Sequence, residues 1–178
     1  MGFSIPIPRR LARLLALGLL PGAFLALPAI TQGPATLVRK PAPQFARTDV
    51  NRQRVDLSAY RGHVVLLNFW ATWCAPCQIE IPRFVQWQDT YGGQGLQIVG
   101  VSMDDESGPV IALTRRRHVN YPMIMGDVEL GRMYGGVLGL PVTFLIDRQG
   151  NIAAVYKGQT SLPAMEREIR RLLSAGAQ

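Results

Sequence analysis

The sequence predicts an α/β domain in which a mixed central β-sheet carries helices on both faces. Three observations indicate this class. Two short, largely apolar runs have the character of strands covered on both sides, Val64–Phe69 and 97–102. A stretch with helical spacing of apolar residues follows each run. Two strand-like segments and a last amphipathic stretch then complete the order βα, βα, α, ββ, α, without an internal repeat.

Short elements precede the first buried strand. Residues 48–54 resemble a turn between two short strands, and residues 58–62 predict a helical turn that ends at glycine. After the strand, a helix is expected over 75–91, where Gly92 and Gly93 stop it. The remaining elements are a strand over 97–102, helices over 110–118 and 126–134, strands over 143–146 and 152–156 joined by a hairpin turn at 147–150, and a helix over 165–173.

The charge of the chain does not favour a nucleic-acid partner. The 178 residues carry a formal charge of +7, but residues 1–30 hold three arginines and no acidic residue. Removing those three from the 19 basic residues leaves 16 against 12 acidic residues, or +4. The remaining run Arg115–Arg117 lies in a predicted helix without interleaved aromatic residues, which is typical of a solvated helix face.

The N-terminus has the pattern of an export signal. Arg9, Arg10 and Arg13 precede the uncharged run Leu14–Ile30. The possible cleavage site at 27–29 is poor, so a retained signal-anchor helix is favoured, although cleavage stays open. We expect a periplasmic or otherwise extracytoplasmic domain, anchored to the cytoplasmic membrane by residues 14–30.

Three parts of the chain follow from this pattern. Residues 1–30 are expected to be the signal sequence or membrane anchor, residues 31–43 a polar, proline-rich tether, and residues 44–178 one folded domain. The domain is long enough to bury a core of its own.

Cys74 and Cys77 are the two cysteines of the chain, and their spacing favours a redox pair. A structural zinc site needs four ligands, and His63 and His118 lack the required spacing. A purely structural disulfide would close a loop too short to constrain the unfolded chain much. A strand end that leads into a helix start favours a thiolate at Cys74, Pro76 stiffens the first turn, and Cys77 comes one turn later.

The stretch Asn68-Phe-Trp-Ala-Thr-Trp-Cys-Ala-Pro-Cys77 resembles the active site of thioredoxin-fold proteins. With Glu80 and Pro82 added, it is similar to the exported, membrane-tethered branch of TlpA and ResA, which is related to CcmG. The similarity also covers residues 40–45 and 139–152, and thus nearly all of the exported part. It implies a thioredoxin-like fold and thiol–disulfide chemistry.

The resemblance also implies a substrate-binding surface around the cysteine pair. Trp73, Ala75 and Pro76 belong to it, together with Leu140 and Pro141. The peptide bond before Pro141 is expected to be cis, which would turn the backbone of Leu140 toward an extended substrate. Trp70 is expected in the core.

Glu80 and Asn68 favour the specialised branch over a general thioredoxin. Asn68 occupies the position of a buried aspartate in general thioredoxins, whereas ResA-like proteins carry a glutamate that matches Glu80. Glu80 is expected at the border of the cysteine side of its helix, where it would raise the thiol pKa values and exchange protons with Cys77. Pro82 is expected to bend this helix by breaking the bond to the carbonyl of Gln78.

These residues predict an exported thiol–disulfide oxidoreductase with Cys74, Cys77 and Glu80 as catalytic residues. The resemblance implies a reductant of disulfides in apocytochrome c or copper-site proteins, re-reduced by a membrane thiol shuttle, with neither cofactor nor metal. Two alternatives stay open: a thiol oxidant, and a metallochaperone or adaptor that binds Cu(I). The acidic run 104–106 is expected to be a solvated loop. Residues 123–125 have strand spacing, so their two methionines are expected to split between core and surface.

Overall fold

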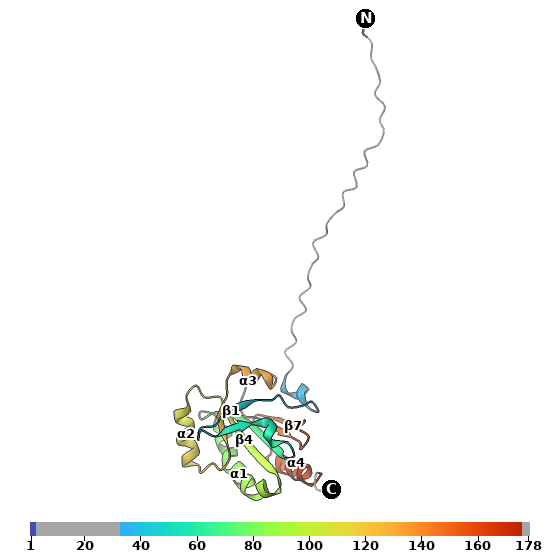
Figure 1. The fold of residues 1–178 in the computed structure, drawn as a ribbon. Coiled ribbons are helices and arrows are strands. Elements are labelled where there is room, and N and C mark those ends of the chain that lie inside the picture. Colours follow the sequence, from blue (N-terminus) through green and yellow to red (C-terminus); the bar gives the residue numbers. More distant parts are fainter. Residues whose placement is uncertain (3–32, 176–178) are drawn as a thin grey trace. The chain divides into compact units, whose positions relative to one another are not determined.

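The computed structural model describes residues 1–2 and 33–175 of the chain (Figure 1). The chain divides into two units, residues 1–30 and 31–178, and the second is the folded domain. The predicted signal-anchor helix lies outside the described residues. No helix in the described part of the chain is long and apolar enough to cross a membrane.

The domain contains a five-stranded sheet and a separate two-stranded hairpin, with four α-helices among the described residues. The strands are β1 (Ala46–Thr48), β2 (Arg54–Asp56), β3 (Val64–Trp70), β4 (Leu96–Ser102), β5 (Met123–Met125), β6 (Val142–Ile146) and β7 (Ile152–Lys157). The helices are α1 (Ala75–Tyr91), α2 (Ser107–Arg116), α3 (Val128–Met133) and α4 (Leu162–Ser174). Short 3₁₀ helices cover Pro34–Leu37, Leu57–Tyr60 and Gly92–Gln94.

The central sheet has the strand order β5-β4-β3-β6-β7 and is mixed, as predicted. Strand β3 runs parallel to β4 and antiparallel to β6, and all seven of its residues are buried. In this register Trp70 pairs with Ser102, and Phe69 pairs with Val142. The end of β3 therefore lies beside the end of β4 and the start of β6.

Alternate residues of β3 build the two halves of the core. Leu66 and Trp70 pack in the cluster that includes residues of α1, α2 and α4. Leu67 and Phe69 pack in the opposite cluster, which includes Leu130 of α3. Side chains of a strand alternate between the faces of a sheet, so helices cover both faces, as the sequence predicted.

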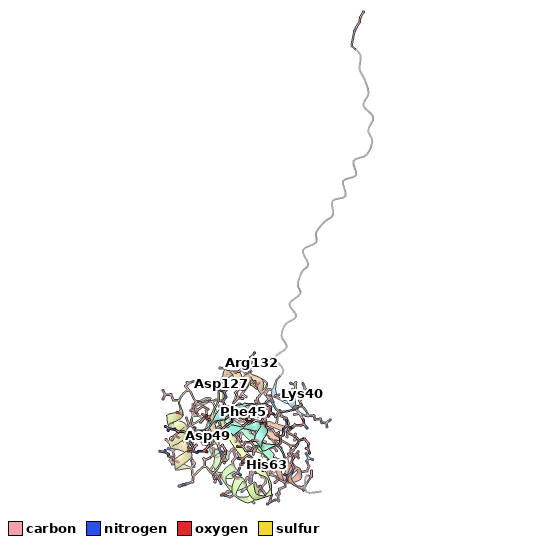
Figure 2. All side chains as sticks on the ribbon, viewed as in Figure 1. Lys40, Phe45, Asp49, His63, Asp127 and Arg132 are labelled. Carbon is pink, nitrogen blue, oxygen red and sulfur yellow. A yellow bond between two sulfur atoms is a disulfide. The ribbon has the colours of Figure 1, made fainter. Side chains whose placement is uncertain are left out.

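The turn between β1 and β2 is organised by a buried acidic residue. Asp49 is one of the residues labelled in Figure 2. Its carboxylate accepts hydrogen bonds from the amides of Asn51 and Gln53, both at 2.8 Å. Such side-chain bonds to nearby amides are the reason that aspartate favours turns. The two short strands predicted on either side of this turn are confirmed as an antiparallel pair.

Three features differ from the sequence prediction. Residues 123–125, which have strand spacing but stand outside the predicted element order, form the edge strand β5, which lengthens the sheet beyond β4. Helix α2 begins at Ser107 and ends at Arg116, so His118 lies beyond it with a positive φ of 51°. Within the expected tether, the amides of Arg39 and Ala42 donate to the carbonyls of Ile152 and Gly150, so this part of the segment is docked on the domain.

Candidate active site

The cysteine pair lies where the central strand leads into the longest helix. Strand β3 ends at Trp70, and α1 begins at Ala75 after a short loop. Cys74 is the N-cap of α1, and its Sγ atom accepts a hydrogen bond from the amide of Cys77 at 3.3 Å. Pro76 lies in the first helical turn, where its missing N–H leaves no bond unmade. The sulfur of Cys74 therefore lies at the positive end of the helix dipole.

The two cysteines form a disulfide, so the structure shows the oxidised state of the pair. Their Cα atoms are 5.3 Å apart. Cys74 keeps 5% of its surface exposed and Cys77 none. Of the two cysteines, Cys74 alone therefore keeps surface that a partner from solvent can reach.

Glu80 lies one turn of α1 after Cys77 and is only 4% exposed. Its Oε2 atom is buried and has no hydrogen-bond partner. Burial therefore raises the pKa of Glu80 from 4.5 to about 7. Glu80 was expected at the border of the core, and the structure places it inside. Tyr121 is also buried, and its pKa is raised first by burial and then by the nearby charge of Glu80.

Asn68 is buried in β3, in the strand that precedes the cysteines. Its Nδ2 atom donates to Oγ1 of Thr143 on β6 at 2.9 Å. The neutral side-chain amide of Asn68 thus pairs with the Thr143 hydroxyl, and this position adds no second carboxylate to the core. Glu80 is left as the one buried carboxylate of α1.

The segment 138–142 lies beside the end of β3. The Leu140–Pro141 peptide bond is cis, which confirms the expectation from the resemblance. Pro141 is buried, Val142 pairs with Phe69, and Leu140 packs against the core cluster that contains both cysteines. A groove of about 470 Å³ borders this segment and is lined by Pro34, Gly135, Gly136, Leu138–Leu140, Val142, Lys157 and neighbouring glycines.

Two apolar side chains next to the cysteines are exposed. Trp73 precedes Cys74 and is 70% exposed, and Ile79 on α1 is 63% exposed. Trp70 is fully buried, as predicted. An exposed tryptophan beside a reactive sulfur favours a docking role over a role in the core.

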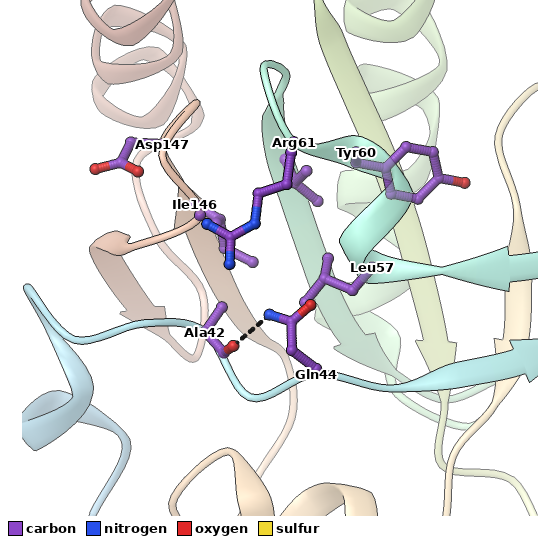
Figure 3. Close-up of a pocket in the computed structure, with 9 residues that line it drawn as sticks. Ala42, Gln44, Leu57, Tyr60, Arg61, Ile146 and Asp147 are labelled. Carbon is purple, nitrogen blue, oxygen red and sulfur yellow. Dashed lines mark hydrogen bonds between the residues drawn. The ribbon is translucent and has the colours of Figure 1, made fainter.

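A second cavity, at the other end of β3, is not a candidate site. It lies between Ala42, Leu57, Arg61 and Ile146, where Gln44 donates to the carbonyl of Ala42 (Figure 3). Its volume is about 10 Å³, which is room for about one water molecule. In the described part of the chain, no cluster of three or more histidine, cysteine or acidic side chains could hold a metal ion.

Sequence reasoning missed Asp104, which was assigned to a solvated loop. Its carboxylate accepts a hydrogen bond from the Thr72 amide at 2.9 Å and another from the Thr72 hydroxyl. Asp105 and Glu106 are exposed, as expected. An acidic run after a strand gives no sign of a partner 32 residues away, so the sequence offered no local signal for this contact.

Comparisons with known proteins agree with this geometry. The family model described as AhpC/TSA family matches residues 38–155. The thiol-disulfide oxidoreductase ResA of Bacillus subtilis (strain 168) is 34% identical over 136 residues, which cover 76% of this chain and 75% of the relative. ResA of Geobacillus kaustophilus (strain HTA426) is 32% identical over 142 residues, covering 80% and 82%. The crystal structure of a thiol:disulfide interchange protein of the thioredoxin family from Chlorobium tepidum TLS superposes with a TM-score of 0.70 at 33% identity, covering 75% of this chain and 95% of that one.

Proposed function

The chain belongs to the AhpC/TSA family and is a ResA-like thiol-disulfide oxidoreductase, and from this premise we propose that it is an exported reductant of protein disulfides. Its substrates would be exported proteins with cysteine pairs, with apocytochrome c or copper-site proteins as the class that the ResA likeness favours. A membrane thiol shuttle would return it to the reduced state. The observation that carries the proposal is the Cys74–Cys77 pair at the start of α1 with a buried Glu80 one turn away, whose Oε2 atom has no hydrogen-bond partner.

The reaction begins from the reduced protein. The thiolate of Cys74 attacks one sulfur of the substrate disulfide, which breaks that bond and forms a mixed disulfide. The second substrate sulfur leaves as a thiolate and takes up a proton. The small exposed fraction of Cys74, 5% against none for Cys77, supports this order of roles.

Cys77 completes the reaction. Its thiolate attacks the Sγ atom of Cys74, the mixed disulfide breaks, and the substrate leaves with both sulfurs reduced. The product is the Cys74–Cys77 disulfide of the structure. Two electrons have passed to the substrate, and the protein is ready to be reduced again.

Glu80 would accept the proton of the Cys77 thiol. A base that titrates near neutral pH is suited to this transfer, and burial raises the pKa of Glu80 to about 7. In the ionised form, Glu80 also disfavours a second negative charge nearby, which raises the pKa of the thiols. A less stable thiolate makes the reduced protein a stronger reductant, in agreement with the proposed direction.

A Cys77→Ser variant of the full chain, expressed in its native membrane, tests this function. Without the resolving thiol, Cys74 should hold its partners as mixed disulfides that disappear on addition of a reductant. Cys74→Ser, which lacks the attacking thiol, is the matched control and should trap none. Recovery of the same abundant thiol proteins with both variants would refute the substrate proposal. Tight Cu(I) binding by the parent with negligible disulfide reduction would favour a metallochaperone.

A further inference from the structure

The loop between β3 and α1 is fixed from outside by one half-buried carboxylate, that of Asp104. Its Oδ2 atom accepts hydrogen bonds from the Thr72 amide at 2.9 Å and from the Ser102 hydroxyl at 2.7 Å. Its Oδ1 atom accepts from the Thr72 hydroxyl. The amide of Asp104 in turn donates to the Ser102 hydroxyl oxygen at 3.1 Å, and Ser102 is fully buried at the end of β4. The carboxylate is therefore itself held by the sheet.

Three backbone carbonyls at this loop have partners other than Asp104. The Thr72 carbonyl accepts from Nε2 of Gln78 on α1 at 2.6 Å. The Trp70 carbonyl accepts from the Met103 amide at 2.8 Å, and the Ala71 carbonyl accepts from the Cys74 amide at 3.2 Å. Asp104 is the acceptor for the Thr72 amide, so its loss would leave that amide without its partner. Bonds to a charged acceptor are about twice as strong as neutral ones.

The position of Thr72 makes this contact important for the redox site. Thr72 lies two residues before Cys74, whose sulfur must stay close to the Cys77 amide, 3.3 Å away. It also directly precedes Trp73, whose side chain is 70% exposed and has little packing of its own to orient it. The backbone on both sides of Trp73 is held by Asp104 and by the start of α1.

We propose that Asp104 is a positioning residue of the redox site, which holds the Thr72 backbone so that Cys74 stays at the N-terminus of α1 and Trp73 is presented to the substrate. The inference uses the proposed function only in taking Cys74 as the attacking thiol. The carboxylate acts as a fixed hydrogen-bond acceptor and takes no part in electron or proton transfer. Reactive groups need support of this kind, because a misplacement of about 1 Å can cost roughly a hundredfold in rate.

The test compares Asp104→Ala with Asp105→Ala in the full chain, because Asp105 is the exposed neighbour. Two readouts are used: the pH profile for alkylation of Cys74 by iodoacetamide in the reduced protein, with the site identified by mass spectrometry, and kcat and KM for the reduction of insulin. In Asp104→Ala, we expect alkylation at pH 7 to slow by roughly tenfold, its midpoint to move to higher pH, and KM to rise. Asp105→Ala should behave as the parent does.

A conservative variant separates the hydrogen bonds from the charge. Asp104→Asn keeps, at the Oδ2 position, an acceptor for the Thr72 amide and the Ser102 hydroxyl, and the Thr72 hydroxyl can rotate to accept from its NH₂ group. We therefore expect its alkylation rate to stay within about threefold of the parent. A loss as large as that in Asp104→Ala would overturn the positioning role.

Other outcomes remain decisive. If Asp104→Ala lowers the unfolding midpoint but leaves the alkylation profile, kcat and KM unchanged, Asp104 is structural only and the proposal is wrong. If Asp104→Ala does not fold, Thr72→Val, which removes the hydroxyl contact alone, should shift both readouts in the same direction by less, and no shift would overturn the proposal. Failure of the parent itself to reduce any disulfide, in insulin or in a peptide that carries the cysteine pair of an apocytochrome c, would refute the proposed function instead.

Discussion

Replacing Glu80 by glutamine should stabilise the oxidised protein against unfolding at neutral to alkaline pH. At acid pH, the part of the unfolding free energy that comes from the titration of Glu80 should hardly change. Glutamine has nearly the same size but cannot ionise. In the parent, the pKa of Glu80 is about 7 in the folded state against 4.5 ordinarily. The folded protein therefore keeps a proton that the unfolded chain loses between these two pH values.

The sign and size follow from proton linkage. Below pH 4.5 Glu80 is protonated in both the folded and the unfolded state, so its titration contributes nothing to the free energy of unfolding. Above about pH 7 the folded state must bury an ionised carboxylate, which lowers the free energy of unfolding. The difference in pKa corresponds to about 3 kcal/mol, and residual screening by solvent reduces it to about 2 kcal/mol. Relative to the parent, the free energy of unfolding of Glu80→Gln should thus increase by about 2 kcal/mol between pH 4.5 and pH 8.

Urea unfolding of the oxidised proteins at pH 4.5, 6 and 8 measures this difference. The disulfide removes the titration of both thiols, so Glu80 is the group near the pair that can titrate in this range. With a typical urea dependence for a small domain, about 2 kcal/mol moves the midpoint by about 1 M. Glu106→Gln, at an exposed side chain, is the control and should show no such trend. A stability difference between Glu80→Gln and parent that is the same at all three pH values would refute a raised pKa at Glu80.

Three further predictions concern the surface, the core and a close contact. Trp73→Ala should raise KM for a protein disulfide several-fold while stability changes by less than about 0.5 kcal/mol, and an unchanged KM would remove Trp73 from the docking surface. Phe144→Ala should lower the free energy of unfolding by about 3 to 5 kcal/mol in urea, because its ring is fully buried; a loss below about 1 kcal/mol would contradict that packing. Gly135→Ala should lower the free energy of unfolding more than Gly136→Ala does. Both glycines have a positive φ, but only at Gly135 would a Cβ atom approach Pro34, at 2.5 Å, so equal losses of free energy would contradict this contact.

The elements with strong local signals were predicted well. Helix α1 has the predicted bounds, because Cys74 begins it as a cap and the glycines at 92 and 93 end it. The buried character of β3 follows from its continuous apolar run. The position of Cys74 and Cys77 at the helix start, and the cis bond before Pro141, agree with the expectations from the motif.

Features that depend on distant partners were missed or misplaced. Residues 123–125 have strand spacing, but three residues are too few to establish a strand, and β5 exists because it pairs with β4. The docked part of 34–43 is proline-rich and polar, yet Ala42 is buried because its amide bonds to the β6–β7 turn. Asp104 was assigned to solvent for the same reason, since its partner Thr72 lies in the loop between β3 and α1, 32 residues away. The roles of the individual site residues stay predictions.

The sulfur of Cys74 is also the cap of α1, and this couples helix stability to redox chemistry. A thiolate accepts the Cys77 amide more strongly than a neutral sulfur does, so the first turn of the helix is better capped in the reduced protein. By reciprocity, any change that strengthens this cap stabilises the reduced form and makes the protein a weaker electron donor. The helix terminus and the carboxylate of Glu80 act in opposite directions on the same sulfur pair. The reduction potential therefore depends on the balance between the Cys77 amide, which stabilises the thiolate, and the Glu80 carboxylate, which destabilises it. Substitutions that weaken the amide contact should lower the potential, and substitutions that remove the carboxylate should raise it.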